Sequence, residues 1–169
     1  NDDVADRAKL DNGPSGLIWG KDRINENILG LNFEISMQSF FQTNPKSAEK
    51  LYSKVIEYAT ESSNLEGKVI MDLFCGTGTI GQIIASQIPT AQVIGVDIVE
   101  SAIANAKKNA TKNGLNEIKW FAADVGKFLS EYPNYKGGID TVILDPPRAG
   151  IAPKTLQKVI ALGANRLIY

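Results

Sequence analysis

Strand-like and helix-like segments alternate without a break from Lys68 to the last residue, Tyr169. Short apolar runs predict strands, and segments with apolar residues three or four positions apart predict helices. The expected strands are Val69–Phe74, Val93–Ile98, Ile118–Ala122, Ile139–Asp145 and Arg166–Tyr169. The expected helices are Thr79–Ile88, Ser101–Asn113, Val125–Glu131 and Pro153–Leu162. This alternation predicts an α/β fold with a doubly wound, mostly parallel sheet that helices cover on both faces.

The part of the chain before Lys68 has a different pattern. Residues 1–15 are polar, and short strand-like pieces are expected at Leu17–Trp19, Arg23–Asn27 and Leu31–Ser36. We interpret residues 1–36 as a linker and the edge of an upstream β region, and residues 37–169 as one domain truncated after its fifth strand. Asn44 and Pro45 are typical of a helix start. The apolar stripe that follows predicts a packed helix, with Ala48, Leu51, Tyr52, Val55, Ile56 and Ala59 on one face.

Composition narrows the classes of function. No apolar run reaches the roughly 20 residues of a membrane helix, and no secretion leader opens the chain, so a cytoplasmic location is expected. The single cysteine, Cys75, cannot form an internal disulfide or a cysteine-rich metal site, and no metal is expected. Without histidine, acid–base chemistry falls to carboxylates, lysines or groups outside this chain. A net charge of −1 is untypical of a stand-alone nucleic-acid binder.

Acidic residues and a glycine loop follow the expected strands. Asp72, Asp97, Asp124 and Asp145 each lie at the end of a strand or just after one, and Gly76-Thr77-Gly78 follows the first strand. The carboxyl ends of parallel strands share one edge of a sheet, which is where doubly wound folds bind ligands. The sequence therefore predicts a ligand site at this edge.

The glycine pattern, with Asp97 placed 21 residues after Gly76, suits either NAD or S-adenosylmethionine (SAM), because both carry a ribose whose hydroxyls can donate to Asp97. Asp72 favours SAM, since a carboxylate within about 5 Å of a diphosphate would repel it. SAM instead carries an ammonium and a sulfonium. Gly76 and Gly78 are expected to let the cofactor approach the backbone closely.

Other positions at this edge have two interpretations each. The backbone amides at the start of the Thr79 helix can receive the SAM carboxylate. Asp124 is expected to accept a hydrogen bond from the adenine amino group, or to cap the short helix after it, or both. Asp72 could alternatively serve as a loop cap. Two prolines after Asp145 stiffen the turn and fix the direction of its carboxylate, although a merely rigid turn is the alternative. Arg148 stands where amine methyltransferases carry an aromatic residue, which counts against amine methylation.

Three segments, in this order and spacing, resemble the RNA 5-methyluridine (uracil-C5) methyltransferase family. They are Ser39-Phe40-Phe41-Gln42-Thr43-Asn44, Asp72-Leu73-Phe74-Cys75-Gly76-Thr77-Gly78 and Asp145-Pro146-Pro147-Arg148-Ala149-Gly150. The resemblance covers nearly the whole chain. It implies a Rossmann-like class I SAM-dependent fold, SAM or S-adenosylhomocysteine as cofactor, and uridine in rRNA or tRNA as substrate. It also implies that Asp145 lies near the target pyrimidine and that SAM is contacted by Gln42, Phe74, Thr79, Asp97, Asp124 and Asp145. By its residues alone, the segment around Gln42 favours core aromatics and a surface glutamine.

The family's chemistry, as the resemblance implies it, starts with a cysteine thiolate that adds to C6 of uracil and activates C5 for methylation. A carboxylate base then removes the C5 proton. The family's cysteine would lie three residues beyond Tyr169, and Cys75, in the glycine loop, is not its substitute. We therefore expect a monomer that binds SAM but cannot methylate alone. The alternatives are a methyltransferase with a cytosine or amine acceptor, an NAD-dependent oxidoreductase, and a catalytically silent binding module.

Overall fold

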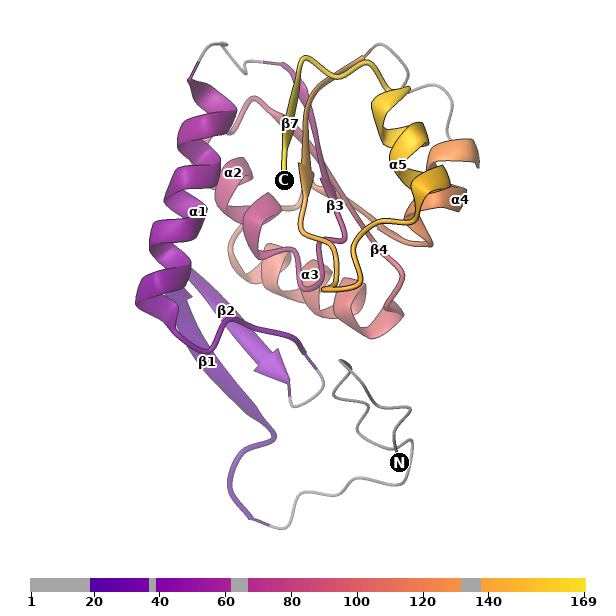
Figure 1. The fold of residues 1–169 in the computed structure, drawn as a ribbon. Helices are drawn as coiled ribbons and strands as arrows, with labels where there is room; N and C mark the ends of the chain where they lie inside the picture. Colours follow the sequence, from indigo (N-terminus) through magenta and orange to yellow (C-terminus); the bar gives the residue numbers. More distant parts are fainter. Residues whose placement is uncertain (1–18, 37–38, 62–66, 132–137) are drawn as a thin grey trace, which may run out of the picture.

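The computed structural model describes residues 19–36, 39–61, 67–131 and 138–169. Within them a five-stranded parallel sheet has the order β5-β4-β3-β6-β7, and β1 and β2 form a separate antiparallel hairpin (Figure 1). The strands are β1 Arg23–Ile28, β2 Leu31–Ser36, β3 Val69–Leu73, β4 Gln92–Asp97, β5 Lys119–Ala122, β6 Ile139–Leu144 and β7 Arg166–Ile168. The helices are α1 Pro45–Thr60, α2 Thr79–Gln87, α3 Glu100–Lys112, α4 Val125–Glu131 and α5 Pro153–Ile160.

This is the doubly wound α/β fold predicted from the sequence, and the strand and helix ends after Lys68 agree to within two residues. In the five-stranded sheet, the first strand along the chain is the central strand β3. The chain then forms β4 and β5 on one side of β3 and crosses over to form β6 and β7 on the other side. Of the expected strand Leu17–Trp19, residues 17 and 18 lie outside the described residues, and Trp19 lies in a bend. None of the described helices is long and apolar enough to cross a membrane.

Helix α1 begins as expected, because the Asn44 side chain accepts a hydrogen bond from the Ser47 amide at 3.1 Å and Pro45 takes the first helical position. The helix ends against β7, where the Arg166 guanidinium donates to the carbonyl oxygens of Tyr58 and Ala59. Four of the six apolar residues expected on its inner face are buried, namely Ala48, Tyr52, Val55 and Ala59.

The two faces of the sheet have separate cores. Along β3, Ile70 belongs to a core cluster formed with α1, α2, α3 and the hairpin, whereas Met71 and Leu73 belong to a second cluster formed with α4 and α5 (Figure 1). Strand residues alternate between the faces, so Asp72 shares the face of Ile70. The carboxylate of Asp72 is therefore enclosed beneath α2, where it meets the backbone of Gly81.

The hairpin packs on the domain rather than standing apart from it. Ile28, Phe33 and Ile35 are buried in the cluster shared with α1, α2 and α3. Glu34 forms ion pairs with Lys108 and Lys112 of α3. The division between an upstream β region and the SAM-binding domain near residue 36 stays a prediction, since residues 37 and 38 lie outside the described residues.

Candidate functional site

Three of the predicted acids lie side by side at the carboxyl edge of the sheet. Asp72, Asp97 and Asp145 end or follow β3, β4 and β6, which are neighbours in the sheet. The backbone amide of Asp145 continues the pairing of β6 with β3 by donating to the Leu73 carbonyl at 3.4 Å. Strand alternation places all three residues on the face that α1, α2 and α3 cover. The fold thus brings together residues that are far apart in the sequence.

Asp72 is the most enclosed of these acids, with 1% of its surface exposed. Its Oδ2 accepts a hydrogen bond from the Gly81 amide at 2.9 Å, so Asp72 does cap the start of α2. Its buried Oδ1 has no hydrogen-bond partner among the described residues. Burial raises the pKa of Asp72 to about 7, and the negative charges of Asp145 and Asp97 add to this rise. A buried acid with a free acceptor atom is suited to a cationic ligand group.

Asp97 holds the glycine loop in place. Its Oδ2 accepts from the Gly76 amide at 2.8 Å, and its Oδ1 accepts from the Val99 amide at 2.8 Å. Each carboxylate oxygen has a second lone pair, so these contacts leave acceptor capacity for ribose hydroxyls. The predicted ribose ligand is therefore also a structural support of the loop, which the sequence did not reveal.

The loop itself has an unusual backbone. Phe74, Gly76 and Gly78 have φ angles of 64°, 53° and 71°. Two are glycines, for which left-handed geometry is easy, but Phe74 is a bulky residue for which it is strained. Strain of this kind concentrates at ligand sites, because surrounding contacts must hold it. Phe74 is half-buried at the mouth of the loop, and the family resemblance implies that it contacts SAM.

The two glycines have different surroundings. A side chain on Gly76 would meet nothing within 4 Å, so its backbone is open to a ligand. A Cβ on Gly78 would lie 2.2 Å from the Trp120 ring, and so would a Cβ on Gly95. The missing side chain at Gly78 therefore makes room for Trp120, and the expected close approach of a ligand is left to Gly76. Thr79 is buried at the start of α2, with its hydroxyl 3.4 Å from that of Thr77.

The remaining predicted residues lie around this centre. Asp124 is exposed, and its Oδ1 caps α4 by accepting from the Lys127 amide at 2.9 Å. Gln42 is half-buried in the irregular segment that leads into α1. Asp145 opens into a groove between α1 and β7, and burial raises the pKa of its carboxyl. Leu51, which the sequence placed on the buried stripe of α1, is half-exposed there and lines this groove.

Two groups near the acids, the buried Tyr52 and the half-buried Cys75, have raised pKa values. Burial, with Asp145 and Asp72 nearby, raises the pKa of Tyr52 to about 12. Burial also raises the pKa of the Cys75 thiol well above its ordinary value, and Asp72 and Asp97 add to the rise. A thiol that stays protonated is a poor nucleophile, so the structure supports the exclusion of Cys75 from that role. Sequence reasoning missed Tyr52, which looked like one more member of the apolar stripe of α1.

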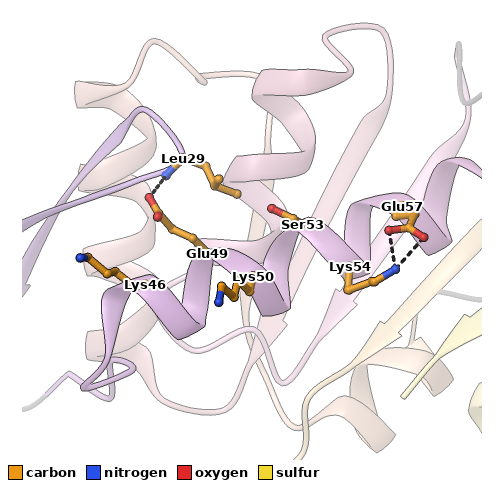
Figure 2. Close-up of a pocket in the computed structure, with 7 residues that line it drawn as sticks. All are labelled: Leu29, Lys46, Glu49, Lys50, Ser53, Lys54 and Glu57. Carbon is orange, nitrogen blue, oxygen red and sulfur yellow. Dashed lines mark hydrogen bonds and ion pairs between the residues drawn. The ribbon is translucent and has the colours of Figure 1, made fainter.

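A second groove runs along the outer side of α1, and it is not the candidate site. Figure 2 shows its lysines between acidic side chains, with Lys54 bonded to Glu57 and Glu49 accepting from the Leu29 amide. None of the site residues expected from the sequence lines it. The Glu49 and Glu57 carboxylates thus have partners within the protein, in contrast to the buried Oδ1 of Asp72, which has no partner among the described residues.

Residues 64–167 match the model of a protein family described as a methyltransferase domain. The chain belongs to this methyltransferase domain family. Membership decides against the NAD-dependent oxidoreductase considered from the glycine pattern. It agrees with the enclosed acid beside the glycine loop, which would repel a diphosphate.

Individual relatives are similar over nearly all of this methyltransferase domain. The chain is 42% identical to an uncharacterized RNA methyltransferase of Clostridium tetani over 169 residues, which is 100% of this chain and 35% of that protein. It is 46% identical to an uncharacterized RNA methyltransferase of Caldanaerobacter subterraneus over 154 residues, which is 90% of this chain and 32% of that protein. The chain thus spans about a third of the length of these relatives.

A solved structure shares both sequence and fold with the chain. It is the Pyrococcus abyssi tRNA (uracil-54, C5)-methyltransferase in complex with S-adenosyl-L-homocysteine, which is 32% identical with a TM-score of 0.70. The similarity covers 91% of this chain and 36% of that one.

Proposed function

We propose that this chain is the SAM-binding part of an RNA methyltransferase that modifies C5 of uridine. The observation that carries the SAM assignment is the buried Oδ1 of Asp72, which has no partner among the described residues, together with the open backbone of Gly76 in the loop that follows β3. The uridine assignment is supported by the similarity to the archaeal tRNA uracil-C5 methyltransferase and by the Phe40-Phe41-Gln42 and Asp145-Pro146-Pro147-Arg148 segments. The proposed substrate is uridine in rRNA or tRNA.

The proposal assigns described residues to the ammonium, carboxylate, ribose and adenine groups of SAM. Oδ1 of Asp72 would accept from the ammonium, and backbone amides at the start of α2 other than that of Gly81 would receive the carboxylate. Asp97 would accept from the ribose hydroxyls while it holds Gly76, and Asp124 would accept from the adenine amino group while it caps α4. Phe74, Thr79 and Gln42 complete the expected contacts. Bound SAM supplies the methyl group.

Asp145 would orient the target base. It lies beside Asp72 on the sheet edge and opens into the groove between α1 and β7, so it faces a surface on which an acceptor can lie. We propose that the nucleophile and the general base come from outside these 169 residues, because the one cysteine lies in the glycine loop and its thiol has a raised pKa. The isolated chain would then bind SAM without methylating RNA. We also propose a cytoplasmic monomer.

Tritium release tests the uridine assignment. The full-length parent protein would be incubated with SAM and RNA carrying tritium only at C5 of uridine. Methylation at C5 expels that hydrogen, whereas methylation of a nitrogen, a ribose oxygen or a cytosine leaves it in place. SAM-dependent release is expected. Methylated RNA that keeps its tritium would overturn the uridine assignment and leave the SAM-binding domain.

A further inference from the structure

Gln82 is a fully buried amide placed directly behind the glycine loop. It lies in the first turns of α2 with 0% of its surface exposed. Its Nε2 donates to the Thr77 carbonyl at 3.3 Å and lies 3.5 Å from the Ala106 carbonyl of α3. Thr77 stands between Gly76 and Gly78, which are both left-handed. The Gln82 side chain therefore connects the left-handed part of the loop to α3.

Asn113 extends this connection to the hairpin. Its Nδ2 donates to Gln82 Oε1 at 3.2 Å and to the Asn32 carbonyl of β2 at 3.1 Å. Its Oδ1 accepts from the Asn32 amide at 3.0 Å. The nitrogen of Gln82 faces carbonyl oxygens, and its oxygen faces the Asn113 amide nitrogen, so only one orientation of each amide satisfies these contacts. The hydrogen bonds thus run from β2 through Asn113 and Gln82 to Thr77.

Burying an amide is costly unless its polar atoms find partners, and an apolar side chain would fill the same space without that requirement. A fully bonded network around a buried amide does something that apolar packing does not, since it allows only one arrangement of the groups it joins. Here one of those groups is the carbonyl between the two left-handed glycines. The network therefore selects the loop conformation in which Gly76 is open and its amide meets Asp97.

We propose that Gln82 and Asn113 are positioning residues that transmit the docking of the hairpin β1–β2 to the glycine loop, and so set the affinity for the methyl donor. This inference rests on the proposed SAM-binding function. Coupling of this kind is reciprocal, so SAM must stabilise the hairpin to the same extent that the docked hairpin strengthens SAM binding. The hairpin becomes part of the cofactor apparatus, although no residue of it was expected to touch SAM.

Asn109, one helical turn before Asn113, provides a matched control. Its Oδ1 accepts from the Glu34 amide at 3.0 Å and its Nδ2 donates to the Glu34 carbonyl at 3.1 Å, the same pair of hairpin bonds that Asn113 forms with Asn32. Asn109 is the more buried of the two asparagines, with 1% of its surface exposed. Its side-chain hydrogen bonds are with the Glu34 backbone and not with Gln82. A purely structural role for these asparagines predicts that loss of Asn109 is at least as harmful.

The test measures the dissociation constant of SAM for the full-length protein carrying Asn113→Ala or Asn109→Ala, together with the thermal midpoint of each. We expect Asn113→Ala to weaken SAM about tenfold, as loss of one hydrogen bond that supports the loop would do. Asn109→Ala should lower the thermal midpoint at least as much while SAM affinity changes less than about twofold. Equal weakening by the two variants would overturn the proposal. Wild-type protein that binds no SAM would instead overturn the proposed function.

A double-mutant cycle removes the remaining ambiguity. Gln82→Met keeps the length of the side chain and removes its amide, so it should also weaken SAM about tenfold. In the double variant with Asn113→Ala, Gln82→Met should cause little further loss of SAM binding free energy, because both changes break the same connection. The losses of SAM binding free energy from Gln82→Met and Asn109→Ala should simply add. Amide exchange gives the reciprocal readout, since SAM should slow exchange in β1 and β2 of the wild type but not of Asn113→Ala. Additive losses in both pairs, or unchanged hairpin protection, would contradict the coupling.

Discussion

The two faces of the central sheet differ in how their buried polar groups are satisfied. Beneath α4 and α5 the buried side chains of the described residues are apolar except for Asp140, which accepts hydrogen bonds from Thr141 and Asn165. Beneath α1, α2 and α3, buried apolar side chains are joined by enclosed polar groups, namely Asp72, Thr77, Thr79, Gln82, Asn109 and Thr141. The buried Oδ1 of Asp72 even lacks a partner among the described residues.

This difference separates stability from binding. A face whose buried groups are apolar or hydrogen-bonded gains free energy from burial and has few groups left to satisfy. A face with a buried carboxylate oxygen that lacks a partner among the described residues is less stable than it could be, which is the usual condition of a site that needs a ligand to complete it. Substitutions on the α4–α5 face should therefore change the free energy of unfolding and spare SAM affinity, whereas substitutions of the polar groups that contact SAM or the glycine loop should change SAM affinity.

The largest expected effect is on the apolar face. Phe128 of α4 is fully buried, and the centroid of its ring lies 4.9 Å from the centroid of the Phe121 ring. Phe128→Ala should lower the free energy of unfolding by about 3–5 kcal/mol, because it removes a large side chain and leaves a cavity. Denaturant unfolding measures this loss. The SAM dissociation constant of the folded protein should stay within a factor of about two; a shift as large as that expected for Asp97→Ala would break the comparison.

The next effect is on SAM affinity. Asp97→Ala should weaken SAM binding by about 2–3 kcal/mol, since two ribose hydrogen bonds to a charged acceptor are lost. It also removes the acceptor of the Gly76 and Val99 amides, so part of the loss comes from the loop. Calorimetric titration of wild type, Asp97→Ala and Asp97→Asn measures it. Asparagine keeps one oxygen acceptor, and an intermediate affinity is expected. Unchanged affinity in both variants would mean that Asp97 does not bind the ribose.

The sequence predicted those parts of the molecule that depend on local pattern. Apolar alternation gave the five strands and the helices between them, because both depend on periods of a few residues. The convergence of Asp72, Asp97 and Asp145 followed from parallel topology, since the ends of parallel strands share an edge. The capping of α1 by Asn44 also depends on near neighbours alone.

The unpredicted parts depend on partners distant in the chain. In the docked hairpin, Glu34 forms ion pairs with Lys108 and Lys112, which lie more than 70 residues away in the sequence. Gly78 matched a cofactor fingerprint, yet its surroundings are set by Trp120, some 40 residues on. Gln82 carried no local signal at all, because a glutamine in a helix is usually exposed. Local periodicity contains no information on such pairings.

The third prediction concerns pH. The pKa of Asp72 is about 7 in the folded protein against an ordinary 3.8, so between pH 4 and 7 the folded state keeps a proton that the unfolded state releases. The stability that Asp72 contributes therefore falls as pH rises through this window. SAM affinity should change in the opposite direction, because the ammonium requires the ionised carboxylate. Below pH 7 affinity should fall by up to about tenfold per pH unit.

Titrations of SAM between pH 5 and 8 check this prediction with Asp72→Asn as the control. The variant cannot ionise, so its SAM affinity should be weak and nearly independent of pH, and its stability should lose the decline between pH 4 and 7. Glu34 does not interfere, since Lys108 and Lys112 lower its pKa to about 2, outside the measured range. A wild-type affinity that is flat across this range would show that the ligand does not use the Asp72 charge.

The smallest effect sharpens the comparison at the boundary between the two faces, where Asp124 caps α4 of the apolar face and is expected to accept from adenine. Serine is as good a helix cap as aspartate, whereas alanine is not. Asp124→Ser should leave the free energy of unfolding within a few tenths of a kcal/mol, and Asp124→Ala should lower it by about 1 kcal/mol. Both should weaken SAM by about 1 kcal/mol, as loss of one hydrogen bond to a charged acceptor does. If SAM binds Asp124→Ser as tightly as wild type, Asp124 serves only the helix, and the binding face ends at Asp97.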